Sequence, residues 1–548
     1  MNIQFFIPNF CKMNRILPFY VFVIFLIIST QNLLDAQQWN LVQNISTSDL
    51  EAQDNLGFSV AIDEDYFITG AWWEDYQLTS NLSTAGAAYL FKRNTSNTWD
   101  EVEKLYAGFP EALGYFGCSV AIDGNQFAVG AYNEDDIPSG SGNAGAVYVY
   151  EILPNGTVQP TAHLVASDPG NGDLFGNNIA MSGGCILIGA HNQDEDITDS
   201  NTMNEAGAAY VFEKQNDGSW IEVQKLVASD RASGDNFGKF LDIRGDKLII
   251  GAPNKTDESN FYFNAGAAYI FEKDPSSGQW IEVQKLLASD RSNFDNFGSD
   301  VAIQNDWGLV GARSKADLSV GGNAGAAYFF NRDNDGDWQE VQKVLANDFD
   351  QNDFFGTSVD VDGSIVAIGA ETEREDPDGN NTVVGAGSVY IFEKQSNDHW
   401  TQVQKVVGEN REVNDLFGSV VAVRDFQIAV GAWSADVPTG SGFLLDAGAA
   451  YIFERDEPLD LKNNTLRQLD VSLSPNPSSG RLRLESKTPL HEASEVFIFN
   501  LLGDELFHDQ LWLNETNDID LSHLPSGIYT IYLKMENQSL KVFKWVKT

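Results

Sequence analysis

The residue types that perform most enzymatic chemistry are sparse in this sequence. Of the six histidines, only His163, His191 and His399 lie outside the C-terminal region, and none belongs to a His-Glu-x-x-His zinc motif. The sequence also has no Gly-x-Ser-x-Gly nucleophile turn and no phosphate-binding loop. His191 stands at the start of a loop, and we interpret it as a solvated side chain, with a ligand role as the alternative. We therefore expect a protein that is not an enzyme and has no catalytic residues.

Carboxylates are abundant, and most copies of one repeated connection carry two aspartates at fixed places. The pairs are Asp49/Asp54, Asp168/Asp173, Asp230/Asp235, Asp290/Asp295 and Asp348/Asp353. Aspartate side chains commonly accept hydrogen bonds from turn amides, which is our interpretation of both members of each pair. Structural calcium between repeats is the alternative, and no cofactor is otherwise expected. The Asp333–Asp337 stretch resembles part of a calcium loop, but its position before Trp338 predicts a hairpin turn.

The overall charge narrows the range of partners. The chain has 79 acidic and 34 basic residues among 548, a formal net charge of −45. Such a surface repels nucleic acid phosphates and anionic membranes, so neither is an expected partner. Only Cys118 and Cys185 lie beyond the N-terminal segment, at non-equivalent places, and we expect two small unpaired side chains rather than a disulfide.

The N-terminus has the order of a secretory signal peptide. Lys12 and Arg15 precede the apolar run 19–28, and small Ala36 precedes Gln37. We predict a signal peptide over residues 1–36 and no membrane insertion after its cleavage. A membrane anchor is the alternative, although the apolar run is short for a span.

Four landmarks recur in fixed order through most of the chain: Phe-Gly, Gly-Ala, Ala-Gly-Ala-Ala-Tyr, and Trp followed by Val-Gln-Lys-Leu. The Phe-Gly glycines are Gly57, Gly117, Gly176, Gly238, Gly298, Gly356 and Gly418. The Gly-Ala glycines follow 13 positions later at Gly70, Gly130, Gly189, Gly251, Gly311, Gly369 and Gly431. Between landmarks lie short runs rich in β-branched and aromatic residues, which predict strands.

Four strands per repeat, in seven repeats, predict an all-β fold with a seven-bladed β-propeller over residues 37–455. The last repeat lacks its own Trp segment, whereas Trp39 precedes the first Phe-Gly. We therefore expect residues 39–43 to supply the outer strand of the seventh blade. This arrangement closes the ring and removes exposed sheet edges.

The repeated Phe-Gly with Gly-Ala-Pro, present in full at Gly251–Pro253, resembles the FG-GAP repeat of integrin α-subunit propellers and bacterial surface proteins. The resemblance covers roughly residues 37–455 and implies the propeller fold. Integrin-type repeats often carry a calcium loop between their first two strands. Here that hairpin is short, as at Asp123-Gly124, so the family's calcium sites are not carried over.

After a polar linker at 456–468, residues 469–548 show Pro/Gly turns between short strands, which predict a small β-sandwich. Its Ser474-Pro-Asn-Pro, Leu524-Pro-Ser-Gly-Ile-Tyr and Lys544-Trp-Val-Lys segments resemble the C-terminal sorting domain of the type IX secretion system. The resemblance implies that residues 469–548 engage the secretion machinery and that the protein is secreted or held at the outer cell surface. An adhesive or carbohydrate-binding sandwich is the alternative.

One connection differs between repeats and so predicts the working face. The connection between the second and third strands spans from 14 residues (Gly311 to Gly325) to 18 (Gly189 to Gly207), whereas the Trp to Phe-Gly segment is constant. Scaffold positions must repeat because every blade packs on its neighbours, but a recognition surface need not. The expected ligand-binding residues on this face are Trp72, Trp73, Tyr132, Arg313 and Trp433.

These features predict a secreted or cell-surface binding or adhesion protein that holds a protein or glycan ligand on one loop face. A polysaccharide-acting hydrolase or lyase on the same scaffold is the alternative. The packing of the aromatic residues against blade ends, without ligand contact, is the alternative for the site.

Overall fold

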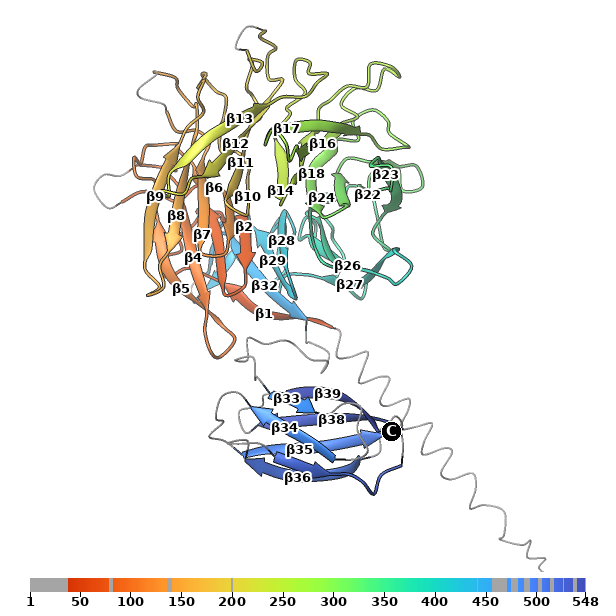
Figure 1. Cartoon of the computed structure of the whole chain (residues 1–548). Coiled ribbons are helices and arrows are strands. Elements are labelled where there is room, and N and C mark those ends of the chain that lie inside the picture. Colours follow the sequence, from red (N-terminus) through yellow and green to blue (C-terminus); the bar gives the residue numbers. More distant parts are fainter. Residues whose placement is uncertain are drawn as a thin grey trace, which may run out of the picture. The chain divides into compact units, whose positions relative to one another are not determined.

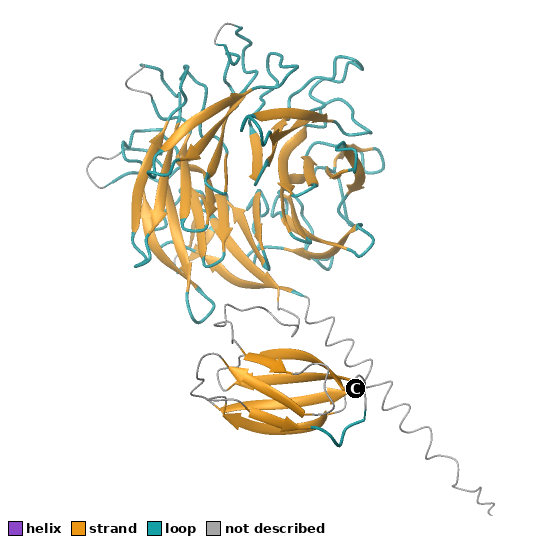
Figure 2. Ribbon diagram, in the orientation of Figure 1, coloured by secondary structure: helices purple, strands orange, loops and turns teal. Residues whose placement is uncertain are grey.

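The structure, a computed structural model, describes residues 38–77, 82–135, 140–198, 201–440, 442–455, 471–474, 481–486, 493–500, 505–512, 517–525, 527–535 and 540–547. The predicted signal peptide and linker lie outside these residues. The chain divides into two compact units, one of which is Gln38–Asp456. Strands and loops make up the described residues (Figure 2), and no helix among them has the length and apolar character of a membrane-crossing segment.

The unit Gln38–Asp456 is the predicted seven-bladed propeller. Each blade is an antiparallel four-stranded sheet, and the innermost strands surround a common axis (Figure 1). Blades 1 and 2 are β2 (Leu56–Asp63), β3 (Tyr66–Ala71), β4 (Ala87–Arg93), β5 (Trp99–Leu105), β6 (Phe116–Asp123), β7 (Gln126–Ala131), β8 (Ala146–Ile152) and β9 (Val158–Leu164). Blades 3 and 4 are β10 (Ile179–Ser182), β11 (Cys185–Ala190), β12 (Ala208–Lys214), β13 (Trp220–Leu226), β14 (Phe240–Arg244), β15 (Lys247–Ala252), β16 (Ala267–Lys273) and β17 (Trp280–Leu286).

The remaining blades follow the same plan. Blades 5 and 6 are β18 (Phe297–Gln304), β19 (Trp307–Ala312), β22 (Ala326–Arg332), β23 (Trp338–Val344), β24 (Phe355–Asp362), β25 (Ile365–Ala370), β26 (Ser388–Lys394) and β27 (Trp400–Val406). Blade 7 is β28 (Val420–Arg424), β29 (Gln427–Ala432), β32 (Ala449–Arg455) and β1 (Trp39–Ile45). The connections between the second and third strands of blades 5 and 7 each contain a two-stranded ribbon. These ribbons are β20 (Ala316–Asp317) with β21 (Gly322–Asn323) in blade 5, and β30 (Val437–Thr439) with β31 (Gly442–Leu444) in blade 7.

The ring closes as predicted. Strand β1 pairs antiparallel with β32, so the N-terminal segment supplies the outer strand of blade 7. The side chain of Gln404 in blade 6 then accepts a hydrogen bond from the Trp39 amide and donates one to its carbonyl, both at 2.8 Å. Gln284 makes the same two contacts with Trp338 in the next blade, so the closing seam repeats an internal one.

The landmark residues recur because packing between and within blades requires them. A Cβ at Gly117 would stand 2.1 Å from the carbonyl oxygen of Ala87, and its φ of 90° lies in the left-handed region. A Cβ at Gly70 would meet the Gly117 carbonyl at 1.8 Å, so the Gly-Ala and Phe-Gly glycines of neighbouring blades require each other. In the six landmarks that contain phenylalanine, this residue packs edge-on against the tyrosine of its own blade, as for Phe297 and Tyr328, whose ring centroids lie 5.4 Å apart; in the first landmark Leu56 takes its place.

The C-terminal region forms two antiparallel sheets within its own unit. Its strands are β33 (Val471–Ser474), β34 (Arg481–Ser486), β35 (Ala493–Asn500), β36 (Glu505–Trp512), β37 (Asn517–Asp520), β38 (Gly527–Met535) and β39 (Leu540–Lys547), in orders β33-β34-β37 and β36-β35-β38-β39. The buried ammonium of Lys547 donates to the carbonyls of Ser522 (2.8 Å) and Leu524, which joins two of the tail motifs. The sandwich packing of the two sheets stays a prediction.

Candidate ligand-binding site at the mouth of the central channel

The inner strands of the propeller line a central cavity of about 580 Å³. Three aspartates from the inner strands of blades 4, 5 and 6 lie in its wall, Asp242 and Asp360 at equivalent positions and Asp300 two residues nearer its Phe-Gly glycine. Each carboxylate accepts a main-chain N–H from the neighbouring inner strand: Asp242 from Ile303 (2.8 Å), Asp300 from Val359 (2.7 Å) and Asp360 from Val423 (2.6 Å). Burial raises the pKa of Asp300 and Asp360 to about 7. These carboxylates tie neighbouring blades together in the channel wall.

At the mouth of this cavity lie residues that directly follow a Gly-Ala landmark. Five of the seven such positions line the cavity: Tyr132, His191, Arg313, Glu371 and Trp433. Three of the five predicted binding residues, Tyr132, Arg313 and Trp433, therefore line the cavity, whereas Trp72 stacks on Phe58, which lines it.

Aromatic rings from blades 7, 1 and 2 form a continuous group, which we call the aromatic arc. Trp72 stacks on Phe58 with ring centroids 4.3 Å apart, and Phe58 meets Trp433 edge-on at 6.0 Å. The arc consists of Phe58, Trp72, Trp73, Tyr115, Tyr132 and Trp433. Trp73 is 39% exposed, whereas the others are half-buried. The arc therefore combines rings held by mutual packing with one ring that projects into solvent.

The indole nitrogen of Trp72 is buried and has no acceptor in the described part of the chain. Indole N–H groups usually find a partner when buried, but the indole nitrogens of outer-strand tryptophans such as Trp39 and Trp99 are in the same state, so it does not by itself mark a ligand site.

The opposite side of the mouth is charged. Arg313 of blade 5 pairs with Glu371 of blade 6 at 2.6 Å, and its guanidinium lies 5.2 Å from the ring centroid of Phe354. Lys239 of blade 4 stands beside them, and burial, followed by the charge of Arg313, lowers its pKa. We call Lys239, Arg313 and Glu371 the charged arc. Arg313 is thus not a free anchor but one half of an ion pair.

The interpretation of one residue needs correction, and two further residues join the site. His191 is not a solvated loop side chain: it lines the channel mouth, and burial lowers its pKa to about 4, so it is neutral at pH 7. Phe58 and Lys239 also line the cavity, and the residues that follow the Gly-Ala landmark could not indicate them. Both follow a Phe-Gly glycine, where the repeats carry Phe58, Cys118, Asn177, Lys239, Ser299, Thr357 and Ser419. The chemical variety of the residue after the Phe-Gly glycine is the sequence signal that indicates this second set of site residues.

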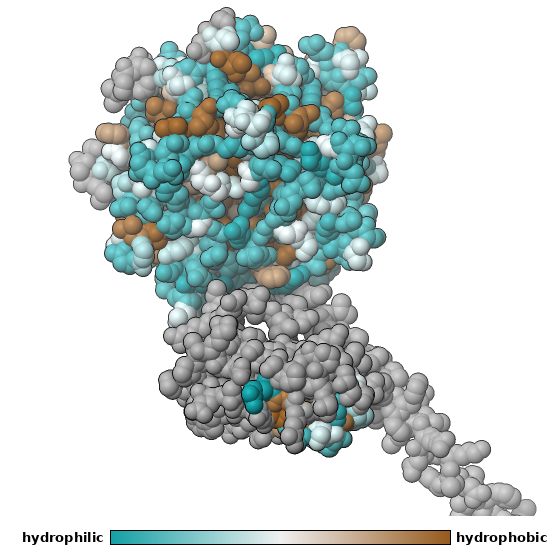
Figure 3. All heavy atoms as spheres, viewed as in Figure 1, coloured by the Kyte–Doolittle hydropathy of each residue, from teal (hydrophilic) through white to brown (hydrophobic). Residues whose placement is uncertain are grey.

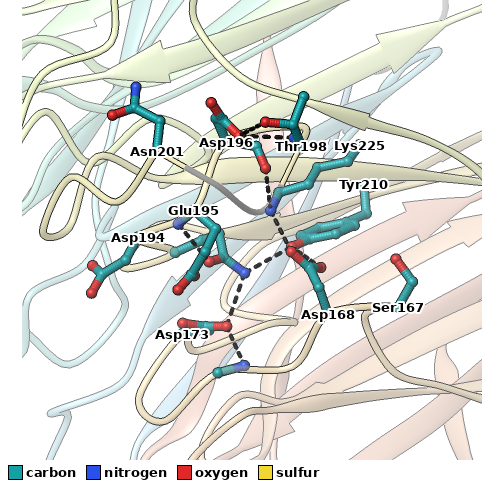
Figure 4. Close-up of polar contacts among 12 residues, drawn as sticks. Ser167, Asp168, Asp173, Asp194, Glu195, Asp196, Thr198, Asn201, Tyr210 and Lys225 are labelled. Carbon is teal, nitrogen blue, oxygen red and sulfur yellow. Dashed lines mark hydrogen bonds and ion pairs between the residues drawn. The ribbon is translucent and has the colours of Figure 1, made fainter.

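The paired aspartates on the fourth-to-first-strand connection have two different roles. The second member caps a turn as predicted: Asp173 accepts the Gly170 amide at 2.6 Å. The prediction was wrong for the first member, because Asp168 accepts instead from the Tyr210 hydroxyl (2.8 Å) and from Lys225. Figure 4 shows Tyr210 and Lys225 pointing toward Asp168. We call the two acids, this tyrosine, this lysine and the residue four positions after the Gly-Ala glycine a seam cluster.

The predicted hairpin turn at Asp333 is confirmed. Its Oδ1 accepts the amides of Asp335 (3.0 Å) and Asp337 (2.9 Å), so this carboxylate serves the turn.

Comparisons with known proteins agree with the fold. The FG-GAP repeat matches seven times, at residues 39–91, 99–150, 159–212, 220–271, 280–330, 338–392 and 400–453. These matches cover more than half of the chain, which therefore belongs to the FG-GAP repeat family. A secretion system C-terminal sorting domain matches residues 472–547. The protein is accordingly exported, with a secreted or outer cell-surface location, and its tail interacts with the type IX secretion machinery.

Two further comparisons add little. No curated protein matches the chain. Among solved structures, the haemagglutinin-neuraminidase of parainfluenza virus 5, crystallised with the ligand DANA, is similar at 8% identity and a TM-score of 0.30. The likeness covers 69% of this chain and 96% of that one and is too weak to bear on function.

Proposed function

We propose that this exported protein is a non-catalytic binding protein that holds a glycan at the mouth of its channel. The observation that carries the proposal is the aromatic arc beside an open cavity. The flat C–H face of a sugar ring packs well on indole and phenol rings, and neighbouring polar groups fix its orientation. Trp72, Trp433 and Tyr132 supply such rings, and Lys239 and His191 supply polar groups across the mouth.

The surroundings of the arc suit recognition outside the cell. The visible propeller surface is mainly hydrophilic, with scattered apolar residues (Figure 3). The aromatic arc is a contiguous group of rings from three blades, as expected of a contact site. A protein ligand would use the same rings but would have to reach into a channel mouth rather than onto a flat face.

A polysaccharide hydrolase or lyase is the second candidate. It is favoured by the raised pKa of Asp300 and Asp360, since a carboxyl group that stays protonated near pH 7 can act as a general acid. Against it, both carboxylates already accept main-chain amides of the next blade, which assigns them to the scaffold.

One experiment separates the two candidates. The full chain is applied to a glycan array, and each bound glycan is then incubated with excess protein and examined by mass spectrometry. Binding without cleavage supports the proposal. Cleavage that the Asp300→Asn and Asp360→Asn variants abolish, while they remain folded, would assign catalysis to the channel instead.

A further inference from the structure

The seam cluster of blade 6 differs from those of blades 4 and 5 in its charge balance. In blade 5, Lys315 lies 2.8 Å from Asp295 and 3.4 Å from Asp290, and Lys343 lies 2.8 Å from the other oxygen of Asp290. One buried ammonium group, that of Lys315, and one partly exposed ammonium group, that of Lys343, thus neutralise two carboxylates. Blade 4 repeats this arrangement, with Lys255 lying 2.8 Å from Asp235.

Blade 6 replaces the first of these lysines by an acid. The position of Lys315 is occupied by Glu373, which is 1% exposed, and Glu375 follows two residues later. In the described part of the chain, the cation paired with this group is Lys405, at 2.7 Å from Asp348 and 3.3 Å from Glu373. Arg411 faces the cluster from the next connection, but its guanidinium donates to two main-chain carbonyls, those of residues 374 and 381.

The cluster also contains a buried carboxylate oxygen with no hydrogen-bond partner. Asp353 is 0% exposed, and its Oδ2 accepts the Asp350 amide, while its Oδ1 accepts nothing among the described residues. Its carboxyl group lies against that of Glu373. In blade 3 the equivalent Asp173 instead receives the amide of Gln193 at 2.9 Å. Leaving a buried carboxylate oxygen unpaired is costly, and blade 6 presents a second carboxyl group to this aspartate where blade 3 has an amide donor and blades 4 and 5 have an ammonium group.

The geometry fits a divalent cation in place of the missing lysine. One carboxylate oxygen each from Asp348, Glu373 and Glu375 lie within 4.8 Å of one another. Two oxygens bound to the same calcium ion at 2.3–2.6 Å can be at most about 5 Å apart, whereas magnesium at about 2.1 Å would require a tighter group. Hard oxygen ligands are those that calcium prefers.

We propose that blade 6 binds one calcium ion through Asp348, Glu373 and Glu375. The carboxyl group of Asp353 faces that of Glu373, the buried ligand of the three, and water completes the shell. The site joins the connection that enters blade 6 to the loop after its second strand. It lies away from the hairpins between first and second strands, where an integrin-type calcium loop would occur. Glu371 precedes the ligand Glu373 by two residues. The ion therefore also fixes the loop that carries the glutamate of the charged arc.

The test is calcium titration of the full chain after chelation, at physiological salt, followed by calorimetry and by melting temperature. We expect one calcium per chain at this site and a melting temperature that rises with calcium. Glu375→Gln should weaken the binding at least tenfold. Glu373→Lys, which recreates the lysine of blade 5, should remove calcium binding and make the melting temperature independent of calcium, without lowering it below that of the calcium-free protein.

The matched control lies in blade 1, where Asp54 and Glu74 form the same carboxylate pair but Tyr76 stands at the position of Glu375. Glu74→Gln should leave calcium binding unchanged. Absence of stoichiometric binding, or equal binding by Glu375→Gln, Glu373→Lys and the parent protein, would overturn the proposal and attribute any affinity to the acidic surface as a whole.

Discussion

The seams between blades and the mouth of the central channel arise from the same seven repeats but follow opposite rules. At the seams, one contact recurs: a glutamine side chain of one blade clamps the main chain of a tryptophan in the next, as Gln224 does for Trp280 and Gln342 for Trp400. At the mouth, equivalent positions carry a tryptophan, a tyrosine, a histidine, an arginine or a glutamate. The repeated residues are therefore those that hold the blades together, and the variable residues are those that the propeller exposes at the channel mouth.

Ring closure should show the largest effect on the seam side of this comparison. Deleting residues 37–45 removes β1, exposes the edge of β32 and leaves the site of Trp39 empty. Loss of a buried tryptophan alone costs about 3–5 kcal/mol. We expect aggregation or a much lower melting temperature in a thermal scan of the full chain with this deletion. An unchanged melting temperature would mean that β1 does not close the ring.

A landmark glycine should come next in size. Gly117→Ala places a methyl group against the Ala87 carbonyl and keeps an unfavourable φ, so we expect a loss of at least about 3 kcal/mol in denaturant unfolding. Gly124→Ala is the matched control, because Gly124 has a positive φ of 61° but no atom near its Cβ. That variant should lose about 1 kcal/mol. Equal losses would show that the conformation, rather than the approach of the blades, selects the landmark glycine.

The glutamine clamp can be tested in both directions. Gln284→Ala removes both hydrogen bonds to Trp338 and should destabilise the protein by about 1–3 kcal/mol. In blade 2 the equivalent residue is Ala162, so Ala162→Gln should add a clamp on Trp220 of blade 3 and raise the melting temperature slightly. A stabilising Gln284→Ala would contradict the role assigned to the clamp.

The smallest expected effect is on pH dependence, through the carboxylate pair of blade 1. Burial, together with the charge of Glu74, raises the pKa of Asp54 from 3.8 to about 8. The folded protein therefore holds a proton that the unfolded chain releases, so this contribution to stability falls as the pH rises from about 4 to 8. Asp54→Asn should flatten the decline of unfolding free energy over that window. If the unfolding free energy falls with pH equally steeply in the parent and the variant, Asp54 is not the source of the decline.

The fold was largely predictable because its determinants repeat. The landmark spacing gave the blades, and the displaced Trp39 gave the closure, both of which the structure confirms. The seam clusters were only half predictable, since the tyrosine and lysine partners of Asp168 come from strands distant in sequence. The mouth was predicted by position but not by contact: spacing cannot show that Arg313 reaches across to Glu371, or that Phe58 supplies the ring on which Trp72 stacks.

The most direct test of the central claim is the affinity of the full chain for a glycan identified on the array, measured by calorimetry with three variants. Trp73→Ala and Trp433→Ala remove rings of the aromatic arc, and Phe261→Ala removes a ring that is 77% exposed on the same face but outside the arc. We expect each arc variant to bind about 30-fold more weakly, as truncating an aromatic anchor does, with a nearly unchanged melting temperature, and Phe261→Ala to bind normally. Unchanged affinity in both arc variants, with a lowered melting temperature, would show that these rings only pack the loops, and would contradict binding at the channel mouth.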